Sequence, residues 1–324
     1  MDGRQFQWIR VRRRNLHGLI DPVLKPLLDG GFFDDPVRQV ALRQGQVVKD
    51  TRVRWAAIVP LGEGKGLFVK RFRVLGRWQS YKYRIAPSRV RREWRISRFL
   101  STRAILTPRP LGVLERREHG LIKESLFMAE ALEGGMDLLT FSEDLLRKPK
   151  GPEKRDQVLG LLAETTRKIH DAGLFHRDLH GGNFLVVEAP PLSLYLVDLH
   201  HARRLPWVPR GKRLWNIAQI YKSLDSVLDE EARRSFLAAY GGGCSPLGDD
   251  PDRSQRRIQG MMRTMARRHE KSRAKRCLKE SSVFTRERRA GFVVFRRREV
   301  KGGDLVEILR SHRQMVEGQG EKLL

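Results

Sequence analysis

The chain has few of the residues that would place it in a membrane or in an oxidising compartment. It contains no run of 18 or more apolar residues among its 324, and its only cysteines are Cys244 and Cys277. A membrane-spanning helix needs an apolar run of about that length, and the chain has none. Two distant cysteines cannot build a disulfide framework or a zinc cage. The N-terminal MDGRQFQWIRVRRR also lacks the apolar core of a secretory signal. The sequence therefore favours a protein of the reducing cytoplasm.

Acidic residues are also scarce, with 38 Asp and Glu against 65 Lys and Arg, which gives a formal net charge of +27. This charge implies a polyanionic neighbour such as nucleic acid, an anionic lipid surface or a phosphorylated substrate, unless it only solubilises the surface. Residues 71–92 contain eight basic residues, four aromatic residues and no acid. Such a segment can bind nucleic acid, lie against an anionic membrane, or be a solvated loop.

Residues 37–73 have the pattern of a three-stranded antiparallel meander. Three segments, VRQVAL, VRWAAIV and GLFVKRFRV, are separated by residues that favour turns. Lys70 falls within the third segment, where a lysine can reach the phosphates of a nucleotide. The sequence GEGKG at 62–66 is too close to Lys70 for a phosphate-binding loop and predicts a hairpin turn. The loop over a nucleotide is then expected near residues 43–51, which offer a single glycine.

A basic helix is expected next. Ser88 can cap a helix over SRVRREWRISRFLS, in which Glu93 is the only acid. This carboxylate is suited to pair with Lys70 and so to hold the lysine toward a nucleotide. Alternatively, Glu93 simply neutralises the neighbouring arginines.

Two further strands are predicted at 106–116 and 120–132, and the second leads into a Gly-Gly connector. Such a connector would join two lobes and form a hinge where adenine bonds to backbone groups. The residues expected to line this hinge are Met128, Glu130 and Leu132. A buried helix is then predicted over 153–172, ended by Gly173.

The segments LFHRDLHGGNFLVV at 174–187 and LYLVDLHHAR at 194–203 follow the order of a phosphotransferase catalytic loop and metal loop. Asp178 would lie where a substrate hydroxyl can reach it, while Asn183 and Asp198 supply the oxygen ligands that Mg²⁺ prefers. The histidines also allow a two-histidine, one-carboxylate iron triad, which would not need Asn183 or Asp198. In a purely structural reading, the histidines pack and the acids are turn residues. The full combination favours transfer of a phosphoryl group to an alcohol.

The motifs FHRDLHGGNFLV, VDLHHAR and RLWNIAQIYKSL resemble the lipopolysaccharide core heptose and Kdo kinase family of Gram-negative bacteria, over roughly residues 30–240. This resemblance implies a two-lobed, protein-kinase-like α+β fold, with a small antiparallel β lobe carrying one key helix and a mainly helical large lobe. It implies that ATP and Mg²⁺ are used to phosphorylate an inner-core sugar hydroxyl at the cytoplasmic face of the inner membrane. The implied site comprises Lys70 on the phosphates, Glu93 orienting it, Asp178 as base or hydroxyl-orienting group, and Asn183 and Asp198 on the metal.

The segment after Asp198 argues against a regulated protein kinase. Only about 16 residues separate it from a helix near Trp215, and no Ala-Pro-Glu motif follows. A small or sugar-like acceptor is favoured. The alternatives are an aminoglycoside- or choline-type kinase, an atypical protein kinase, and a nucleic-acid-binding protein on a kinase-like scaffold. Asn183, His201 and Asn216 stand where the resembled family often has His, Arg and Asp.

Four regions are expected along the chain. They are a basic N-terminal segment at 1–30, a small lobe at 31–132, a large lobe at 133–245 and a basic C-terminal extension at 246–324. Residues 251–324 have 21 basic against 9 acidic residues. They include a predicted basic amphipathic helix at 253–276, which either rests on anionic lipid or packs on the large lobe, and a strand pair at 281–300.

Overall fold

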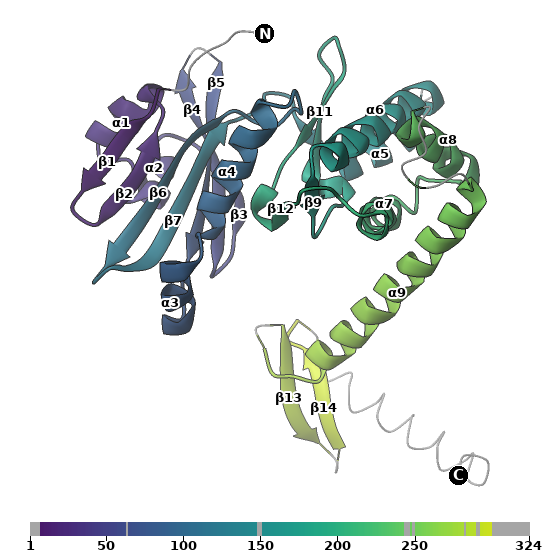
Figure 1. The fold of residues 1–324 in the computed structure, drawn as a ribbon. Helices are drawn as coiled ribbons and strands as arrows, with labels where there is room; N and C mark the ends of the chain where they lie inside the picture. Colours follow the sequence, from purple (N-terminus) through teal and green to yellow (C-terminus); the bar gives the residue numbers. More distant parts are fainter. Residues whose placement is uncertain are drawn as a thin grey trace. The chain divides into compact units, whose positions relative to one another are not determined.

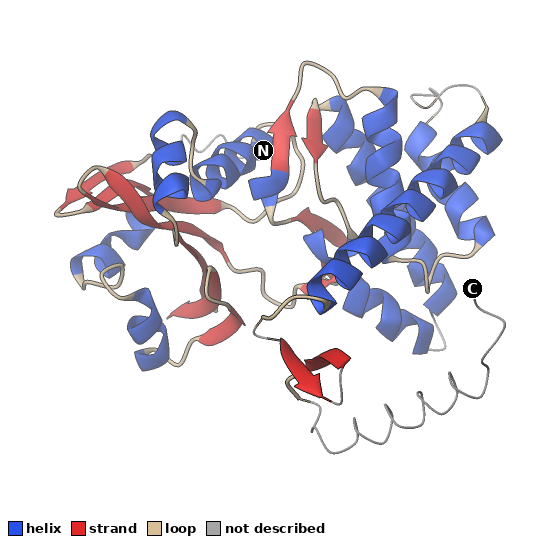
Figure 2. Cartoon of the chain, turned by 90° about the horizontal axis from the view of Figure 1, so that it is seen from below, coloured by secondary structure: helices blue, strands red, loops and turns tan. Residues whose placement is uncertain are grey.

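The computed structural model describes residues 7–62, 64–147, 151–242, 247, 250–281, 283–289 and 292–299. It divides into two compact units, Met1–Gln259 and Gly260–Leu324. The first unit contains a small lobe rich in strands and a large lobe rich in helices, which Figure 2 distinguishes as red and blue elements. The two-lobed α+β architecture predicted from the sequence is therefore present in this unit.

A seven-stranded antiparallel sheet forms the small lobe, in the order β1-β2-β6-β7-β5-β4-β3. The strands are β1 Ile9–Arg13, β2 Leu16–Ile20, β3 Gln46–Asp50, β4 Arg54–Gly62, β5 Lys65–Arg73, β6 Pro110–Glu118 and β7 Leu121–Glu130. The hairpin predicted at 62–66 joins β4 to β5. Gly62 and Gly64 take φ values of 89° and 71° in this turn, which glycine adopts without steric cost.

Two parts of the N-terminal region differ from the sequence prediction. VRQVAL is not a strand, because Pro36–Leu42 forms helix α2. Asp35 caps this helix by accepting a hydrogen bond from the backbone N–H of Arg38, and Pro36 occupies the first helical turn. The meander therefore starts at β3, and the turn that follows its first strand lies between β3 and β4. Residues 9–20, for which no strands were predicted, form the β1–β2 hairpin beside β6.

Helices cover both faces of the sheet (Figure 1). The short η1 Pro22–Leu24, α1 Lys25–Asp29 and α2 pack on one face, and α4 Arg89–Ser101 packs on the other. Because side chains alternate along a strand, Leu126 and Met128 enter the first core, while Phe127 and Ala129 enter the second. The same alternation in β5 directs Lys70 toward α4.

Helix α4 is the basic helix predicted after Ser88. The Ser88 hydroxyl accepts a hydrogen bond from the backbone N–H of Arg91 and so caps the helix. Buried residues recur at helical spacing on the face toward the sheet, and they include Val90, Glu93, Trp94, Ser97 and Leu100. The carboxylate of Glu93 thus lies within an otherwise largely apolar face.

The large lobe is built mainly from helices: α5 Leu138–Arg147, α6 Gly151–Asp171, α7 Arg210–Ser223 and α8 Glu230–Gly241. Short elements carry the catalytic segment, namely β8 Met136–Asp137, β9 Leu174–His176, η2 Gly181–Asn183, β10 Phe184–Val187, β11 Ser193–Leu196, η3 Leu199–His201 and β12 Ala202–Arg204. The helix predicted over 153–172 is α6, and Gly173 with φ 74° ends it. β10 pairs with both β8 and β11, and β9 pairs with β12.

The C-terminal part contains a helix and a hairpin. Helix α9 Pro251–Cys277 begins in the first unit, where Ile258 is fully buried, and it continues into the second. β13 Phe284–Arg289 and β14 Phe292–Arg297 form an antiparallel pair. The predicted basic helix and strand pair are thus both present. Within the described ranges, no helix has the length and apolarity that crossing a bilayer requires.

Candidate active site

Lys70 is the centre of a buried ion cluster. Its Nζ donates to both carboxylate oxygens of Glu93 at 2.9 Å and to Oδ1 of Asp198 at 2.5 Å. Strand β5 and helix α4 supply the first two residues, and the segment after β11 supplies the third. Only 1% of the Lys70 side chain is exposed, so little water screens these contacts. The structure brings three of the predicted site residues into direct contact.

Asp198 has a constrained backbone and several cationic neighbours. Its φ and ψ of 60° and 45° are left-handed, a conformation that Asp and Asn adopt more readily than most residues. Arg54 Nη1 lies 3.3 Å from its Oδ2, and His200 Nδ1 lies 2.5 Å from its Oδ1. Burial opposes ionisation, yet the contact with His200 and the charges of Lys70 and Arg54 hold the pKa of Asp198 well below its usual range. Asp198 is therefore a stable anion.

Burial also favours the neutral form of two neighbouring groups, Glu93 and His200. It raises the pKa of Glu93, against the lowering effect of Lys70. It lowers the pKa of His200 to about 4, so this imidazole is neutral near pH 7. Glu93, Asp198 and His200 place donor atoms within 4.8 Å of one another, as a metal centre would. The Lys70 ammonium already bonds to both carboxylates, so it supplies the cation of this cluster.

The catalytic loop is tied to the segment that carries Asp198. His176 is completely buried; its Nδ1 accepts from the backbone N–H of Asp178 at 3.3 Å, and its Nε2 donates to the carbonyl oxygen of Asp198 at 3.2 Å. This pattern assigns the ring proton to Nε2. Asn183 Nδ2 donates to the carbonyl oxygen of Asp178 at 2.5 Å. The Asp178 side chain itself is 61% exposed, so its backbone is fixed while its carboxylate faces solvent.

Helix α7 holds the backbone of the same loop through three polar side chains. Asn216 Nδ2 donates to the carbonyl oxygen of His176 at 2.5 Å. Gln219 Nε2 donates to the carbonyl oxygen of Arg177 at 2.8 Å, and its Oε1 accepts from the backbone N–H of Leu179 at 3.2 Å. Ser223 Oγ accepts from the backbone N–H of Gly181 at 2.8 Å. Positions 216, 219 and 223 lie on one helical face, so a single helix fixes the loop.

Behind Asn216, a chain of hydrogen bonds runs to α8. Asn216 Oδ1 accepts from His170 Nε2 at 3.1 Å, and His170 Nδ1 accepts from the hydroxyl of Tyr240 at 2.8 Å. That hydroxyl accepts in turn from Arg213 Nη1 at 3.2 Å. Burial lowers the pKa of His170 to about 4 and raises the pKa of Tyr240 to about 12. Both groups are therefore neutral near pH 7, as this bonding pattern requires.

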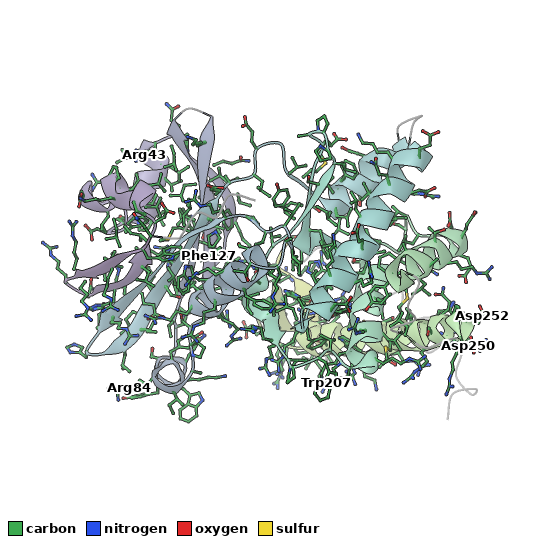
Figure 3. The ribbon with its side chains drawn as sticks, turned by 45° about the horizontal axis from the view of Figure 1, so that its top comes forward. Arg43, Arg84, Phe127, Trp207, Asp250 and Asp252 are labelled. Carbon is green, nitrogen blue, oxygen red and sulfur yellow. The ribbon has the colours of Figure 1, made fainter. Side chains whose placement is uncertain are left out.

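An apolar cavity of about 370 Å³ adjoins the ion cluster. Its polar end contains Lys70, Glu93, Asp198 and Arg54, and its walls include Val48, Ile58, Phe68, Phe127, Ala129, Leu132, Leu185 and Val197. Phe127, labelled in Figure 3, pairs in register with Lys70 across β5 and β7. Glu130 and Leu132 line the cavity, as expected for a hinge, whereas Met128 is buried in the opposite core. Asp178 and Asn183 lie outside the lining.

Several residues of the site were not found from the sequence. Arg54 and His200 contact Asp198, and Gln219 and Ser223 hold the catalytic loop. The spacing of Asn216, Gln219 and Ser223 along one face of a predicted helix was an available signal. Arg54 gave none, because one arginine among many basic residues carries no distinguishing pattern.

The segment after Asp198 is short, and backbone hydrogen bonds hold it against the large lobe. Ala202–Arg204 forms β12, which pairs with β9, and the N–H of Leu205 donates to the carbonyl oxygen of Gly173 at 2.7 Å. Helix α7 then begins at Arg210. This leaves no room for a long activation loop or a peptide platform, in agreement with the sequence prediction.

Comparison with known proteins identifies the family. The profile of the lipopolysaccharide kinase (Kdo/WaaP) family matches residues 39–240, well over half of the chain. The lipopolysaccharide core heptose(I) kinase WaaP of Pseudomonas aeruginosa is 28% identical over 217 residues, covering 64% of this chain and 80% of the relative. The enzyme of the same name from Escherichia coli is 24% identical over 225 residues, covering 66% and 84%.

A solved structure shares the fold. It is WaaP in complex with acyl carrier protein, with a TM-score of 0.54 and 24% identity, covering 76% of this chain and 96% of that one. The resemblance and the kinase-like fold inferred from the sequence motifs are thus confirmed. The chain belongs to the lipopolysaccharide kinase (Kdo/WaaP) family and is a phosphotransferase that acts on a sugar hydroxyl.

Proposed function

We propose that this chain transfers the γ-phosphoryl group of ATP to a hydroxyl of an inner-core heptose or Kdo, at the cytoplasmic face of the inner membrane. The observation that carries the proposal is the Lys70 cluster with Glu93 and Asp198, at the polar end of an apolar cavity. A buried lysine beside an apolar cavity is suited to bind the phosphates of a nucleotide whose base occupies that cavity. The relatives, named heptose(I) kinases, support the same reaction class.

The nucleotide would lie along the cavity. Adenine fits between the apolar walls, and the hinge segment with Glu130 and Leu132 borders them. Among the hydrogen bonds of the described residues, the N–H groups of Glu130 and Ala131 are used, and none involves the N–H of Leu132. The Leu132 N–H is therefore the hinge donor we assign to adenine. Lys70, held by Glu93, would contact the phosphates.

The donor set fits Mg²⁺. Asp198 offers an anionic carboxylate, and Asn183 offers its amide oxygen because its amide nitrogen is engaged with the Asp178 carbonyl. These are the hard oxygen ligands that Mg²⁺ prefers. When bound, the ion would neutralise charge on the phosphates of the nucleotide. Arg54 and Lys70 would hold the Asp198 carboxylate in place for this role.

Asp178 is the residue we assign to the acceptor hydroxyl. Its carboxylate is exposed, so a hydroxyl can approach it, while its backbone is bonded to His176 and Asn183. A group held in this way can orient the hydroxyl and accept its proton as the phosphoryl group transfers. The short segment after Asp198 leaves the acceptor side open to a sugar. An anionic inner-membrane surface is the proposed setting, because the acceptor is part of a lipid.

Transfer of radiolabelled phosphate from Mg-ATP to lipopolysaccharide from a strain that lacks this chain tests the proposal. Asp178→Asn and Asp198→Asn should each reduce transfer by a hundredfold or more, on the order expected for removing a group that acts in the transition state. Asp225→Asn, at an exposed ion pair with Arg233, is the matched control and should retain transfer. Mass spectrometry of the product should show one added phosphate on a core sugar.

Other outcomes would replace the proposal. Full transfer by both site variants would remove Asp178 and Asp198 from the mechanism. Phosphorylation of aminoglycoside, choline or peptide in preference to the core sugar would move the chain to another acceptor class. Tight nucleic-acid binding that falls steeply with salt, without transfer, would favour a binding protein.

A further inference from the structure

Helix α3 Arg77–Ile85 presents an apolar stripe to solvent. Trp78 is 84% exposed, Tyr81 is 48% exposed and Ile85 is 95% exposed. Their spacings of three and four residues place all three on one side of the helix. We call these three residues the α3 stripe. The guanidinium of Arg84 lies 6.0 Å from the ring centroid of Tyr81, and Trp78 and Ile85 are almost fully exposed.

The orientation of α3 is the reverse of that expected for a surface helix. Ser80, on the opposite side, is only 4% exposed, and its hydroxyl donates to the carbonyl oxygen of Ile122 at 3.0 Å. An ordinary surface helix buries its apolar side and exposes its polar side. Here a polar contact anchors the helix to β7 and leaves the apolar side outward. Clustered exposed apolar side chains of this kind mark an interaction surface.

The segment that contains the stripe is rich in basic residues. Residues 71–92 contain eight basic residues and no acid. Lys82 and Arg84 lie in the last turn of α3, and Figure 3 labels Arg84 among nitrogen-tipped side chains at this edge of the lobe. Aromatic and aliphatic residues on one face with basic residues beside them are typical of helices that lie in the headgroup region of an anionic bilayer.

The small lobe also carries a cationic cavity, of about 450 Å³, between the β1–β2 hairpin, β6 and α4. Its five arginines are Arg10, Arg12, Arg91, Arg95 and Arg117, which we call the arginine cleft. Glu115, 1% exposed, pairs with Arg91 and Arg117, and the other three have no acidic partner among the described residues. Arginine forks are suited to bind phosphate oxygens.

The β6–β7 turn lies beside α3 and follows the strand that carries Arg117 of the arginine cleft. A Cβ built at Gly120 in this turn would lie 3.7 Å from Nη2 of Arg84. Arg117 of the cleft is three residues earlier on β6. The apolar stripe and the phosphate-binding arginines are therefore neighbouring features of one lobe.

We propose that α3 docks this chain on an anionic bilayer, with the α3 stripe in the interfacial region and the arginine cleft on headgroup phosphates. The proposal rests on the proposed function, because a kinase of lipopolysaccharide core meets its acceptor in a membrane. A protein partner would require roughly 800 Å² on each side, more than three side chains supply. Nucleic acid would not explain Ile85, which offers no ring for stacking on bases.

Co-sedimentation of the full chain with vesicles tests the docking. The chain should bind vesicles of phosphatidylethanolamine and phosphatidylglycerol and bind phosphatidylcholine vesicles far more weakly. The double variant Trp78→Ser and Ile85→Ser should lose about tenfold or more of its partition coefficient, since both side chains would leave water on binding. Trp207→Ser is the matched control, because Trp207 is 70% exposed on the large lobe, and it should bind as the wild type does.

A charge variant provides the second measurement. Arg10→Gln with Arg12→Gln should weaken binding to the anionic vesicles and flatten its dependence on salt. Melting temperatures should be unchanged in all these variants, since the altered side chains are exposed. Equal vesicle binding by the stripe variant and the wild type would overturn the proposal. The proposal would also be overturned if the wild type failed to bind anionic vesicles. The same holds if α3 bound only an acidic protein and not the vesicles.

Transfer to a water-soluble acceptor separates this proposal from the proposed function. With deacylated inner-core oligosaccharide, the stripe variant should retain wild-type kcat, because α3 does not contribute to the cavity lining. Asp178→Asn should bind vesicles normally and lose transfer. If vesicle binding depends on the α3 stripe but the chain transfers no phosphate, the docking proposal stands and the proposed function fails. If the chain transfers phosphate but its vesicle binding does not depend on the α3 stripe, the proposed function stands and the docking proposal fails.

Discussion

Asn216 Nδ2 donates a 2.5 Å hydrogen bond to the carbonyl oxygen of His176, and this bond joins α7 to the catalytic loop. The acceptor is a backbone carbonyl, so the side chain at 216 must be a donor there. Its Oδ1 simultaneously accepts from His170 Nε2. An amide satisfies both partners, whereas an ionised carboxylate would satisfy only the second. The bonding thus shows why an amide side chain suits position 216.

Asn216→Ala should lower both stability and activity. The variant leaves the His176 carbonyl and the His170 ring without their buried partner, a loss of about 1–3 kcal/mol. Urea unfolding measures the stability change, and kcat measures the effect on the loop. A double-mutant cycle with Gln219→Ala should be non-additive, because Gln219 Oε1 also accepts from Asn216 Nδ2 at 2.8 Å. Strict additivity would show that the two side chains act separately.

Lys70→Met should abolish most transfer. The variant removes the one cation that, among the described residues, bonds to both Glu93 and Asp198, and it leaves their carboxylates buried and close to each other. We expect kcat/KM for ATP to fall by about a hundredfold or more. Lys65→Met, an exposed lysine of the same strand, is the control and should keep wild-type kinetics. Unchanged kcat/KM in Lys70→Met would separate the cluster from nucleotide use.

Asn183→Ala should raise the Mg²⁺ concentration needed for half-maximal transfer by roughly tenfold or more. The change removes the amide oxygen assigned to the ion and also the bond to the Asp178 carbonyl. Titration of activity with Mg²⁺ at saturating ATP measures the shift. Asn15→Ala, in the β1–β2 turn, should titrate as the wild type does. If excess Mg²⁺ fully restores kcat, the bond to Asp178 is dispensable.

Folding stability should fall as pH decreases from 6.5 toward 4. The pKa of His170 is lowered by burial from 6.5 to about 4, so below pH 6.5 the unfolded chain binds a proton that the folded chain does not. The loss approaches about 1.4 kcal/mol per pH unit for one such group, and His200, also at about 4, adds to it. His170→Gln should show a shallower decline in urea unfolding across this range. If the free energy of unfolding of His170→Gln declined with pH as steeply as that of the wild type, groups other than His170 would cause the decline.

Much of the fold followed from local patterns. The hairpin at 62–66, the helix capped by Ser88, the helix ended by Gly173 and the strand pair near the C-terminus are set by turn and cap residues close in sequence. Lys70, Glu93 and Asp198 were predicted as site residues because their spacing around recognisable strands and helices is characteristic of a phosphotransferase, and the structure places the three in contact.

The misread parts depended on competing or distant interactions. VRQVAL has strand-like composition, but the Asp35 cap and Pro36 favour a helix start. The β1–β2 hairpin is recognisable only through its partner β6, about a hundred residues away. Arg54 reaches Asp198 over 144 positions, and no local pattern encodes such a contact.

The left-handed backbone of Asp198 restricts how this position can vary during evolution. Most side chains are disfavoured at φ 60°, and the backbone readily accepts Gly, Asn and Asp. Of these three, only Asp carries the anion that meets Lys70 and Arg54. A homologue that loses activity at this site therefore has Asn as its least disruptive substitution, since the fold would persist after the chemistry is gone. Under the proposed function, Asn at position 198 of a homologue is therefore expected to mark an inactive enzyme.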